Sequence, residues 1–413
     1  MWPEASQRFS IIVATRERPR SLLRTLRAIR QLDYPNFEVV VVGDALADDA
    51  LSGAEWGWLR FVRFDQPNLS AARNAGVAAA AGDVLAFIDD DAVPEPTWLT
   101  HHDSSLLESG ATASVGFVRG PDGIRFQSRF HSIDREARTH DERADGESPF
   151  VPDLPEGRAV KLIGTNMAIR SDVLRALGGF DSNYHYFLED SDISLRLSDA
   201  GHRSVVTPLA EVHHSLEPSC LRTARRAPRT LFDVGRSTAI FLRRHSREPV
   251  EEFLEFTAKD ERKRAVGHMI RGDLEPGDIG RLMHSLRIGW SEGISCSLEC
   301  LPRLPTGPEI FLKVSPLPAG HQVLVSRRFG RASALRHATD LARRAARASV
   351  FSFSLTSWRH TVRYTERGVW LHAGGQFRET ESTGRRFRWC RFARRADEEI
   401  ARVAKRRGLD DGK

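Results

Sequence analysis

The first half of the chain alternates short apolar runs with amphipathic stretches. The apolar runs cover residues 9–14, 37–42, 59–64 and 84–88. After the first run, Leu22, Leu26 and Ile29 recur at helical spacing, and an Ala-rich stretch at about 70–80 predicts a second helix. Strands separated by single helices predict an α/β fold with a parallel sheet, and such sheets bind ligands at the carboxyl ends of their strands. We therefore expect functional residues directly after these runs.

The next hundred residues break the alternation. Between about residues 128 and 157, charged residues with Pro and Gly predict a long loop, which in a compact domain is typically a lid or a substrate-binding segment. Apolar residues return at 160–169. A helix is then expected after Asp190, carrying Ile193 and ending at Gly201.

Length and charge indicate more than one domain. The 413 residues exceed the roughly 100 to 200 of a typical domain. The formal charge of +6 hides a division, because residues 1–219 carry 22 Lys and Arg against 33 Asp and Glu, a net −11, whereas the remainder carries 39 against 22, a net +17. The two parts should have different surfaces and partners. We expect domains at residues 1–219, 220–305 and 306–413.

The sequence also bears on location. No run reaches the roughly 18 apolar residues of a membrane span, and the first residues lack the basic and then apolar order of a signal peptide. Four cysteines make no disulfide framework. These features predict a soluble, cytoplasmic protein, and the basic second part allows a peripheral position at the inner face of the membrane.

Three adjacent aspartates follow the run at 84–88. In an extended segment Asp89 and Asp91 point the same way, while Asp90 faces elsewhere. Two such carboxylates repel unless a cation lies between them, and oxygen ligands suit Mg²⁺ or Mn²⁺. A solvated turn is the alternative, but the position at a strand end favours a metal site. His213 and His214 are either structural residues or the source of a third ligand.

A second acidic group contains Glu189, Asp190 and Asp192 and follows Tyr186 and Phe187. Acidic residues at a helix start often only oppose the helix dipole. The aromatic neighbours favour a partly desolvated carboxylate instead, which is what a general base near neutral pH needs. The pattern leaves both interpretations open.

Five motifs in this order resemble the family 2 glycosyltransferases, which have the GT-A fold, over about residues 8–216. The motifs are Ser10-Ile-Ile-Val-Ala-Thr-Arg-Glu-Arg-Pro, Asn68-Leu-Ser-Ala-Ala-Arg-Asn-Ala-Gly, Gly82-Asp-Val-Leu-Ala-Phe-Ile-Asp-Asp-Asp, Gly178-Gly-Phe-Asp, and Glu189-Asp-Ser-Asp-Ile-Ser-Leu-Arg-Leu. The resemblance implies transfer of a sugar, with inversion, from a nucleoside diphosphate to an acceptor hydroxyl.

The resemblance also implies roles for individual residues. Asp89, Asp91 and His214, with His213 as the alternative to His214, would hold Mn²⁺ or Mg²⁺. Asp190 would be the catalytic base and Glu189 its neighbour. Contacts to the substrates, with a UDP-sugar as the leading donor, would come from Ala14, Thr15, Arg16, Asp44, Arg73, Asp90 and Asn166.

The sequence departs from the family pattern on the nucleotide side. Gly43 stands where an aspartate is expected to meet the base, so that Asp44 would have to substitute from one position later. Leu69 stands where a Gly often follows Asn68. Both departures bear on which nucleotide base is bound more than on the class of reaction.

The part after residue 219 is less informative. A basic helical stretch is expected at about 221–245. An accessory α/β module follows, with strand-like runs at 310–314, 322–325, 350–355 and 368–372. The stretch 385–407 holds ten basic residues. It is interpreted as a solvated or intramolecular face, as a patch for anionic lipid or a phosphate-bearing acceptor, or as a nucleic-acid surface, which no accompanying motif favours.

The leading hypothesis is a metal-dependent inverting glycosyltransferase with a basic C-terminal accessory region, acting on a glycan, lipid-linked or other phosphate-bearing acceptor. The alternative is a non-catalytic protein that binds a nucleotide sugar and recruits a polyanionic partner through its basic C-terminal half.

Overall fold

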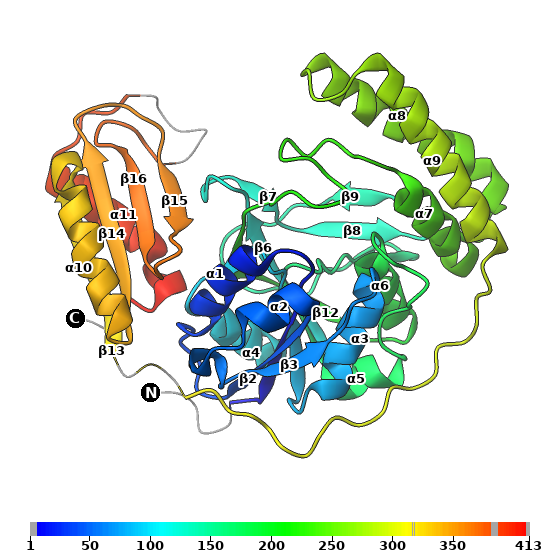
Figure 1. Ribbon diagram of the computed structural model, residues 1–413, viewed down its shortest axis with the longest axis horizontal. Coiled ribbons are helices and arrows are strands. Elements are labelled where there is room, and N and C mark those ends of the chain that lie inside the picture. Colours follow the sequence, from blue (N-terminus) through cyan, green and yellow to red (C-terminus); the bar gives the residue numbers. More distant parts are fainter. Residues whose placement is uncertain (1–5, 316, 318, 381–386, 410–413) are drawn as a thin grey trace.

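The chain folds into three groups of elements (Figure 1). The computed structural model describes residues 6–315, 317, 319–380 and 387–409. The first group is a large α/β domain up to residue 214, the second is a set of helices, and the third is a small α/β module at the opposite side of the domain.

A nine-stranded sheet forms the centre of the α/β domain. Its strands lie in the order β3-β2-β1-β4-β11-β6-β12-β5, with β7 paired to β6. Strands β3, β2, β1 and β4 are parallel, and β11 runs antiparallel between β4 and β6. The bounds are β1 (Phe9–Ala14), β2 (Phe37–Gly43), β3 (Arg60–Arg63), β4 (Val84–Phe87), β5 (Ala92–Pro94), β6 (Ala113–Arg119), β7 (Phe126–Ser128), β11 (Met167–Arg170) and β12 (Ser204–His214). The predicted α/β fold with a mostly parallel sheet is confirmed.

Helices cover both faces of this sheet. Phe9, Ile11 and Val13 pack into a core with α1 and α4, whereas Ile12 packs into a second core with α3, α5 and α6. Burial on both sides explains why Ile11, Ile12 and Val13 follow one another in β1 instead of alternating with polar residues. The bounds are α1 (Pro19–Ile29), α2 (Ala45–Ala50), α3 (Leu69–Ala79), α4 (Trp98–Ser109), α5 (Ser171–Ala176) and α6 (Glu189–Asp199), with the 3-10 turn η1 (Ala54–Trp56).

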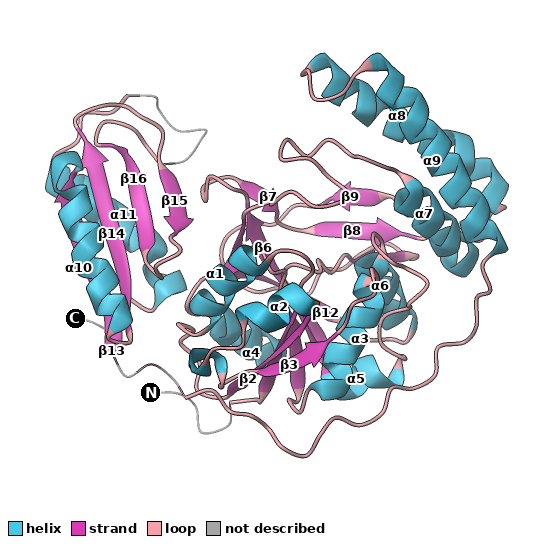
Figure 2. Cartoon of the chain, in the orientation of Figure 1, coloured by secondary structure: helices cyan, strands magenta, loops and turns pink. Residues whose placement is uncertain are grey.

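The prediction of a long loop between residues 128 and 157 is wrong in part. Strands β8 (His131–Asp134) and β9 (Thr139–Asp141) form a hairpin, and β10 (Arg158–Val160) joins it to make a three-stranded sheet (Figure 2). Its buried residues Ile133 and Ala159 pack with helices α6 and α7. Strands this short and rich in charge carry too little apolar alternation to be seen in the sequence.

The helical group follows β12. It contains α7 (Phe232–His245), η2 (Val250–Phe253), α8 (Leu254–Ile270) and α9 (Pro276–Ser295). Helix α7 packs on α9 and is tied to the α/β domain, because His245 Nε2 lies 2.9 Å from the buried Asp192. None of the described helices has the length and apolarity that a membrane crossing requires.

An extended strap at residues 299–315 then runs beneath the α/β domain to the module (Figure 1). The Leu312 amide donates to Glu38 Oε2 at 2.9 Å, and the Val314 amide donates to the Phe37 carbonyl at 2.8 Å. The strand predicted at 310–314 is therefore wrong, because its apolar side chains belong to this strap.

The C-terminal module has the sheet order β13-β14-β16-β15, with the first three strands parallel. Its bounds are β13 (Ala319–Arg327), η3 (Arg328–Gly330), α10 (Arg331–Arg343), β14 (Ala346–Ser354), β15 (Thr361–Tyr364), β16 (Trp370–Gly375) and α11 (Phe392–Arg407). Trp370 and Val362 pack against Ala28 and Val93 of the α/β domain.

Much of the basic stretch 385–407 points inward. Arg395, Arg406 and Arg407 are buried in α11. Arg406 Nε lies 2.8 Å from Glu211 of β12, and Arg395 Nη1 lies 3.2 Å from the buried Glu399. These contacts support the intramolecular interpretation for α11. Residues 385 and 386 lie outside the described residues.

Candidate active site

The predicted metal and catalytic residues lie close together, at strand ends and at the start of a neighbouring helix. Asp89 and Asp91 follow β4, His214 ends β12, and Glu189 and Asp190 begin α6. These places adjoin because β4, β11, β6 and β12 are consecutive in the sheet and α6 packs on the same face as α3.

Asp89, Asp91 and His214 form one cluster. One ligand atom from each lies within 4.8 Å of the other two. His214 Nε2 is 3.0 Å from Asp91 Oδ1, and the other ring nitrogen, Nδ1, is 3.1 Å from Gln127 Oε1 on β7. Two carboxylates and an imidazole with its second nitrogen held in place are a suitable ligand set for a divalent cation.

His213 points to the opposite side of β12, as strand alternation requires. Its Nε2 is 2.9 Å from the buried Glu95, and its ring packs on Trp370 of the C-terminal module at 4.9 Å between centroids. The structure therefore brings His214, and not His213, to Asp89 and Asp91.

The charges around Asp91 favour its ionised form. Burial opposes ionisation, but the hydrogen bond and charge of His214, together with Arg18, hold the pKa of Asp91 at about 2. In the same way, burial would lower the pKa of His214, but Asp91 raises it above its ordinary value. The cluster already has one strongly ionised carboxylate at neutral pH.

Asp90 lies behind the cluster and is fully buried. Thr15 Oγ1 donates to Asp90 Oδ2 at 2.6 Å, and Arg18 Nη2 lies 2.8 Å from Asp90 Oδ1. Burial raises the pKa of Asp90 to about 7, although Arg18 opposes the shift. Arg18 also reaches Asp91 at 3.1 Å. Asp90 thus fixes the carboxyl end of β1 against that of β4.

Arg73 joins the two acidic groups. It is 3% exposed, with Nη1 2.8 Å from Glu189 Oε1 and Nη2 3.5 Å from Asp89 Oδ1. Burial, followed by the charge of Asp190, raises the pKa of Glu189, and Arg73 opposes this shift. The predicted contact of Arg73 to the nucleotide is untested; in the structure its guanidinium lies between the two carboxylates.

A second link runs through residues 164 and 165. The Gly164 amide donates to Asp190 Oδ2 at 3.2 Å, and Thr165 Oγ1 donates to Asp89. A Cβ at Gly164 would lie 2.3 Å from Arg73 Nη2, so only glycine leaves room for that guanidinium. Asp190 is held beside the cluster and is only half-buried.

Helix α6 begins from a strained backbone. Phe187 and Leu188 have φ values of 79° and 67°, in a region that non-glycine residues rarely adopt. Two such residues in succession just before Glu189 and Asp190 indicate that the surrounding structure fixes where the helix starts. Asp192, in contrast, bonds to Arg196 and His245 and has a structural role.

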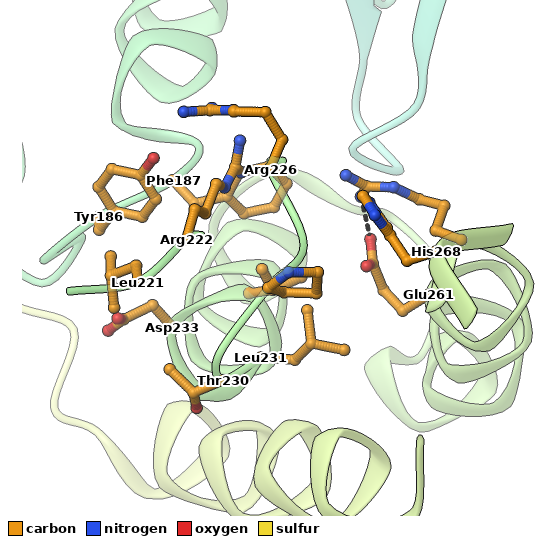
Figure 3. Close-up of a pocket in the computed structure, with 13 residues that line it drawn as sticks. Tyr186, Phe187, Leu221, Arg222, Arg226, Thr230, Leu231, Asp233, Glu261 and His268 are labelled. Atoms are coloured by element: carbon orange, nitrogen blue, oxygen red, sulfur yellow. Dashed lines mark hydrogen bonds and ion pairs between the residues drawn. The ribbon is translucent and has the colours of Figure 1, made fainter. Parts of the chain in front are cut away.

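A pocket opens beside this helix start. Figure 3 shows Tyr186, Phe187, Arg222 and Arg226 along one part of it, and His268 of α8 across from them. The guanidinium of Arg222 lies 5.9 Å from the Tyr186 ring centroid. Burial lowers the pKa of Arg226, an effect that is opposed by the charges of Tyr186 and Asp91. Within the described part of the chain, neither arginine has an ion-pair partner.

Other predicted substrate contacts lie at the edge of the site. Ala14 ends β1, and the exposed Arg16 pairs loosely with Glu17 at 3.5 Å. Both carboxylate oxygens of Asp44 are engaged, one by the Ala47 amide at the start of α2 and one by the Glu17 amide.

Crowding explains the departure from the family pattern at position 43. A Cβ at Gly43 would lie 2.8 Å from Thr15 Cγ2 and 2.7 Å from Ala47 Cβ. An aspartate does not fit there, and Asp44 serves as the helix cap instead.

Asn166 does not reach the site surface. It is fully buried, with its side-chain nitrogen donating to the carbonyls of Phe117 and Ala210 at 2.9 and 2.7 Å. Its side-chain oxygen accepts from Trp98 Nε1 at 2.8 Å. We correct the prediction that it contacts substrate, because its amide binds the strands beneath the site.

Sequence reasoning missed Arg18, Thr165 and Gln127. Arg18 lies inside a quoted motif, and its place directly after a strand end was the available signal. Thr165 contacts Asp89 and Gln127 contacts His214 because the fold brings them together from distant positions, and no local sequence pattern marks either residue.

Comparison with known proteins gives one family match. Residues 10–178 match the model of glycosyl transferase family 2. A pre-mycofactocin glycosyltransferase of Mycobacterium tuberculosis is 28% identical over 214 residues, which are 50% of this chain and 42% of that protein. A glucosyl-dolichyl phosphate glucuronosyltransferase of Haloferax volcanii is 26% identical over 223 residues, covering 50% of this chain and 69% of the relative.

Each of these two relatives matches half of the chain. The chain spans less than half of the length of the mycobacterial relative. Among solved structures, the crystal structure of GalNAc-T7 with UDP, GalNAc and Mn²⁺ aligns with 71% of this chain and 57% of its own chain. The sequence identity is 15% and the TM-score is 0.47.

Proposed function

The chain contains a glycosyltransferase domain of family 2, and from this premise we propose that the protein is a metal-dependent inverting glycosyltransferase. The donor is a nucleoside-diphosphate sugar, with a UDP-sugar as the leading candidate. The acceptor is a hydroxyl on a phosphate-bearing molecule, of which a lipid-linked glycan is the leading type.

One observation carries the proposal. The half-buried Asp190 lies next to the cluster of Asp89, Asp91 and His214. Arg73 contacts both Asp89 and Glu189. Gly164 contacts Asp190, and the neighbouring Thr165 contacts Asp89. An ionic site beside an accessible carboxylate is what displacement of a diphosphate by a hydroxyl needs.

The side chains of the cluster fit a divalent cation. Asp89 and Asp91 supply oxygen ligands and His214 a nitrogen ligand, which suits Mn²⁺ and is compatible with Mg²⁺. When bound there, such a cation would neutralise charge on the diphosphate as a Lewis acid. Arg18 already balances the charges of Asp90 and Asp91, so the acidic group stays compact without further neutralisation.

The base in this proposal is Asp190. It accepts the proton of the acceptor hydroxyl as the oxygen attacks the anomeric carbon. The Gly164 amide orients one of its oxygens, while Arg73 holds Glu189 in an ion pair and keeps it from competing. One base suffices for direct displacement, and inversion follows from attack opposite the leaving group.

The pocket in Figure 3 supports a phosphate-bearing acceptor. It includes Tyr186 and Phe187, three and two residues before Glu189, and presents Arg222 and Arg226 without an ion-pair partner among the described residues. Guanidinium groups bind phosphate oxygens through paired hydrogen bonds, and the aromatic rings beside them suit a sugar or isoprenoid.

A donor screen tests the proposal. Nucleoside-diphosphate sugars are added with and without Mn²⁺, and thermal stabilisation and release of the nucleoside diphosphate are measured. We expect one donor both to stabilise the protein with Mn²⁺ and to be hydrolysed slowly. Stabilisation without any turnover, with or without acceptors, would favour the alternative of a non-catalytic binding protein.

A further inference from the structure

The carboxyl edge of the C-terminal module carries a separate cluster of residues. Strands β13, β14 and β16 are parallel, so their carboxyl ends at Arg327, Ser354 and Gly375 lie along one edge of the sheet. The family match ends at residue 178, and no proposed catalytic residue belongs to this module. The edge therefore needs its own explanation.

Five large apolar side chains are exposed along this edge. Phe329 is 100% exposed, Trp389 77% and Leu355 67%, and Phe387 and Trp358 are also more than half exposed. We call these five residues the aromatic edge. Exposed aromatic residues gathered in one place indicate an interaction surface, whereas single ones need no explanation.

Contacts within the module join two parts of the aromatic edge, the segment after β14 and the segment that carries Phe387 and Trp389. The Phe377 ring stacks on Trp389 at 5.1 Å and lies 5.8 Å from Phe387. The Phe377 amide donates to the Thr356 carbonyl, and the Gly375 amide donates to the Trp358 carbonyl. These bonds bring the segment after β16 beside the segment after β14.

Basic side chains border the same surface. Arg328, Arg331 and Arg359 line a shallow cavity with Trp358. The Arg328 guanidinium lies 4.5 Å from the Trp358 ring centroid. Among the described residues these three arginines have no ion-pair partner. The buried Arg395, Arg406 and Arg407 of α11, in contrast, are all paired.

We propose that the aromatic edge and its arginines bind the surface of a membrane that contains anionic phospholipid. Aromatic rings are enriched at the level of lipid headgroups, and unpaired arginines beside them attract acidic headgroups. The exposed aliphatic Leu355 favours the acyl boundary over a nucleic acid, because bases bind through stacking on aromatic rings and contacts to basic side chains and have no use for an aliphatic one.

This surface shares only part of the stretch 385–407 that the sequence suggested as a lipid patch. Phe387 and Trp389 belong to the aromatic edge, but the arginines of α11 are buried or paired, so the charged part of the contact comes from the arginines after β13 and β14. The inference does not depend on the proposed glycosyl transfer, because it involves no residue of the active site.

Vesicle flotation with the full chain tests the proposal. Vesicles of phosphatidylcholine alone are compared with vesicles containing 30% phosphatidylglycerol, at low and high salt. We expect flotation only with the acidic vesicles, and at least a tenfold loss at high salt. Binding to both vesicle types alike, or to neither, would overturn the proposal.

Two variants locate the surface. Arg328→Ala with Arg359→Ala should lower flotation at least tenfold, and Phe329→Ser with Trp358→Ser should do the same at low salt. The matched control is Arg336→Ala with Arg344→Ala, which removes the same charge from exposed positions of α10 and its end and should leave flotation unchanged. If the control variant loses as much flotation, net charge alone explains the effect, and the assigned surface is wrong.

A nucleic-acid control completes the experiment. A labelled single-stranded oligonucleotide is titrated against the same variants. Tight oligonucleotide binding that is lost in the Phe329 and Trp358 variant, without flotation of the unaltered protein, would overturn the membrane proposal in favour of a nucleic-acid surface.

Discussion

Arg407 donates a hydrogen bond from Nε to Glu95 Oε2 at 2.9 Å, and both side chains are buried where the C-terminal module meets the α/β domain. Arg407 also contacts His372 of the module at 2.7 Å, while Glu95 contacts His213 of β12 at 2.9 Å. His213 precedes the proposed ligand His214. The module therefore packs against the strand that supplies the proposed metal ligand His214.

Arg407→Ala should destabilise the protein by about 3 to 5 kcal/mol, because it leaves Glu95 buried without its guanidinium. Chemical unfolding measures the effect, and Arg336→Ala on the exposed face of α10 is the control, expected to stay within about 0.5 kcal/mol. Equal stability of the two variants would show that the buried pair does not fasten the module.

Stability should fall at acid pH for the same reason. Burial alone would raise the pKa of Glu95, but Arg407 and His213 hold it well below its ordinary value of 4.5. A carboxyl with a lowered pKa in the folded protein stabilises it above the unfolded value and loses this effect as pH falls below it. We expect the melting temperature to drop below about pH 4.5. In Glu95→Gln that part of the drop should be missing, and an identical pH profile for the two proteins would contradict the assignment.

The proposed metal site depends on Gln127. Its oxygen lies 3.1 Å from His214 Nδ1 and so orients the imidazole. Gln127→Ala should weaken Mn²⁺-dependent nucleotide binding by about 10- to 100-fold, the usual effect of losing such a partner. Calorimetry at several Mn²⁺ concentrations measures this. His214→Ala should lose more, and unchanged binding in both variants would remove His214 from the ligand set.

Gly164→Ala should impair transfer more than folding. The new methyl would meet Arg73 Nη2 at 2.3 Å and displace the guanidinium from Asp89 and Glu189. We expect at least a tenfold lower kcat. Gly280→Ala in α9 is the control, since nothing lies within 4 Å of its Cβ position, and it should stabilise by up to about 1 kcal/mol. Normal kcat in Gly164→Ala would mean that Arg73 does not position the catalytic carboxylates.

The sequence predicted the parts of the site that local patterns encode. Asp89 and Asp91 follow a buried strand and Asp190 starts an amphipathic helix, so their positions depend on elements that periodicity reveals. Thr165 was missed because its contact with Asp89 exists only once β4 and the segment before β11 meet. The place of Arg18 after a strand was visible in the sequence, but its pairing with Asp90 and Asp91 was not. Asn166 was predicted wrongly, since neither its burial nor its bonds to distant carbonyls leave a mark in the sequence.

The accessory region was the least predictable part. Basic residues in α11 resemble a surface patch in the sequence, yet Arg407 pairs with Glu95, 312 positions away. A contact of that range cannot be derived from composition or spacing. The small sheet containing β8 and β9 escaped for a different reason, because its strands are too short to show alternation.

In the proposed reaction, Asp190 acts as the base of a metal-dependent sugar transfer. The most direct test compares Asp190→Asn with the unaltered protein, using the donor found in the screen and measuring both nucleotide binding with Mn²⁺ and sugar transfer. We expect nearly unchanged binding and a loss of transfer of about a thousandfold, within the 10²- to 10⁴-fold that a general base contributes. Transfer at the unaltered rate by Asp190→Asn would contradict this role.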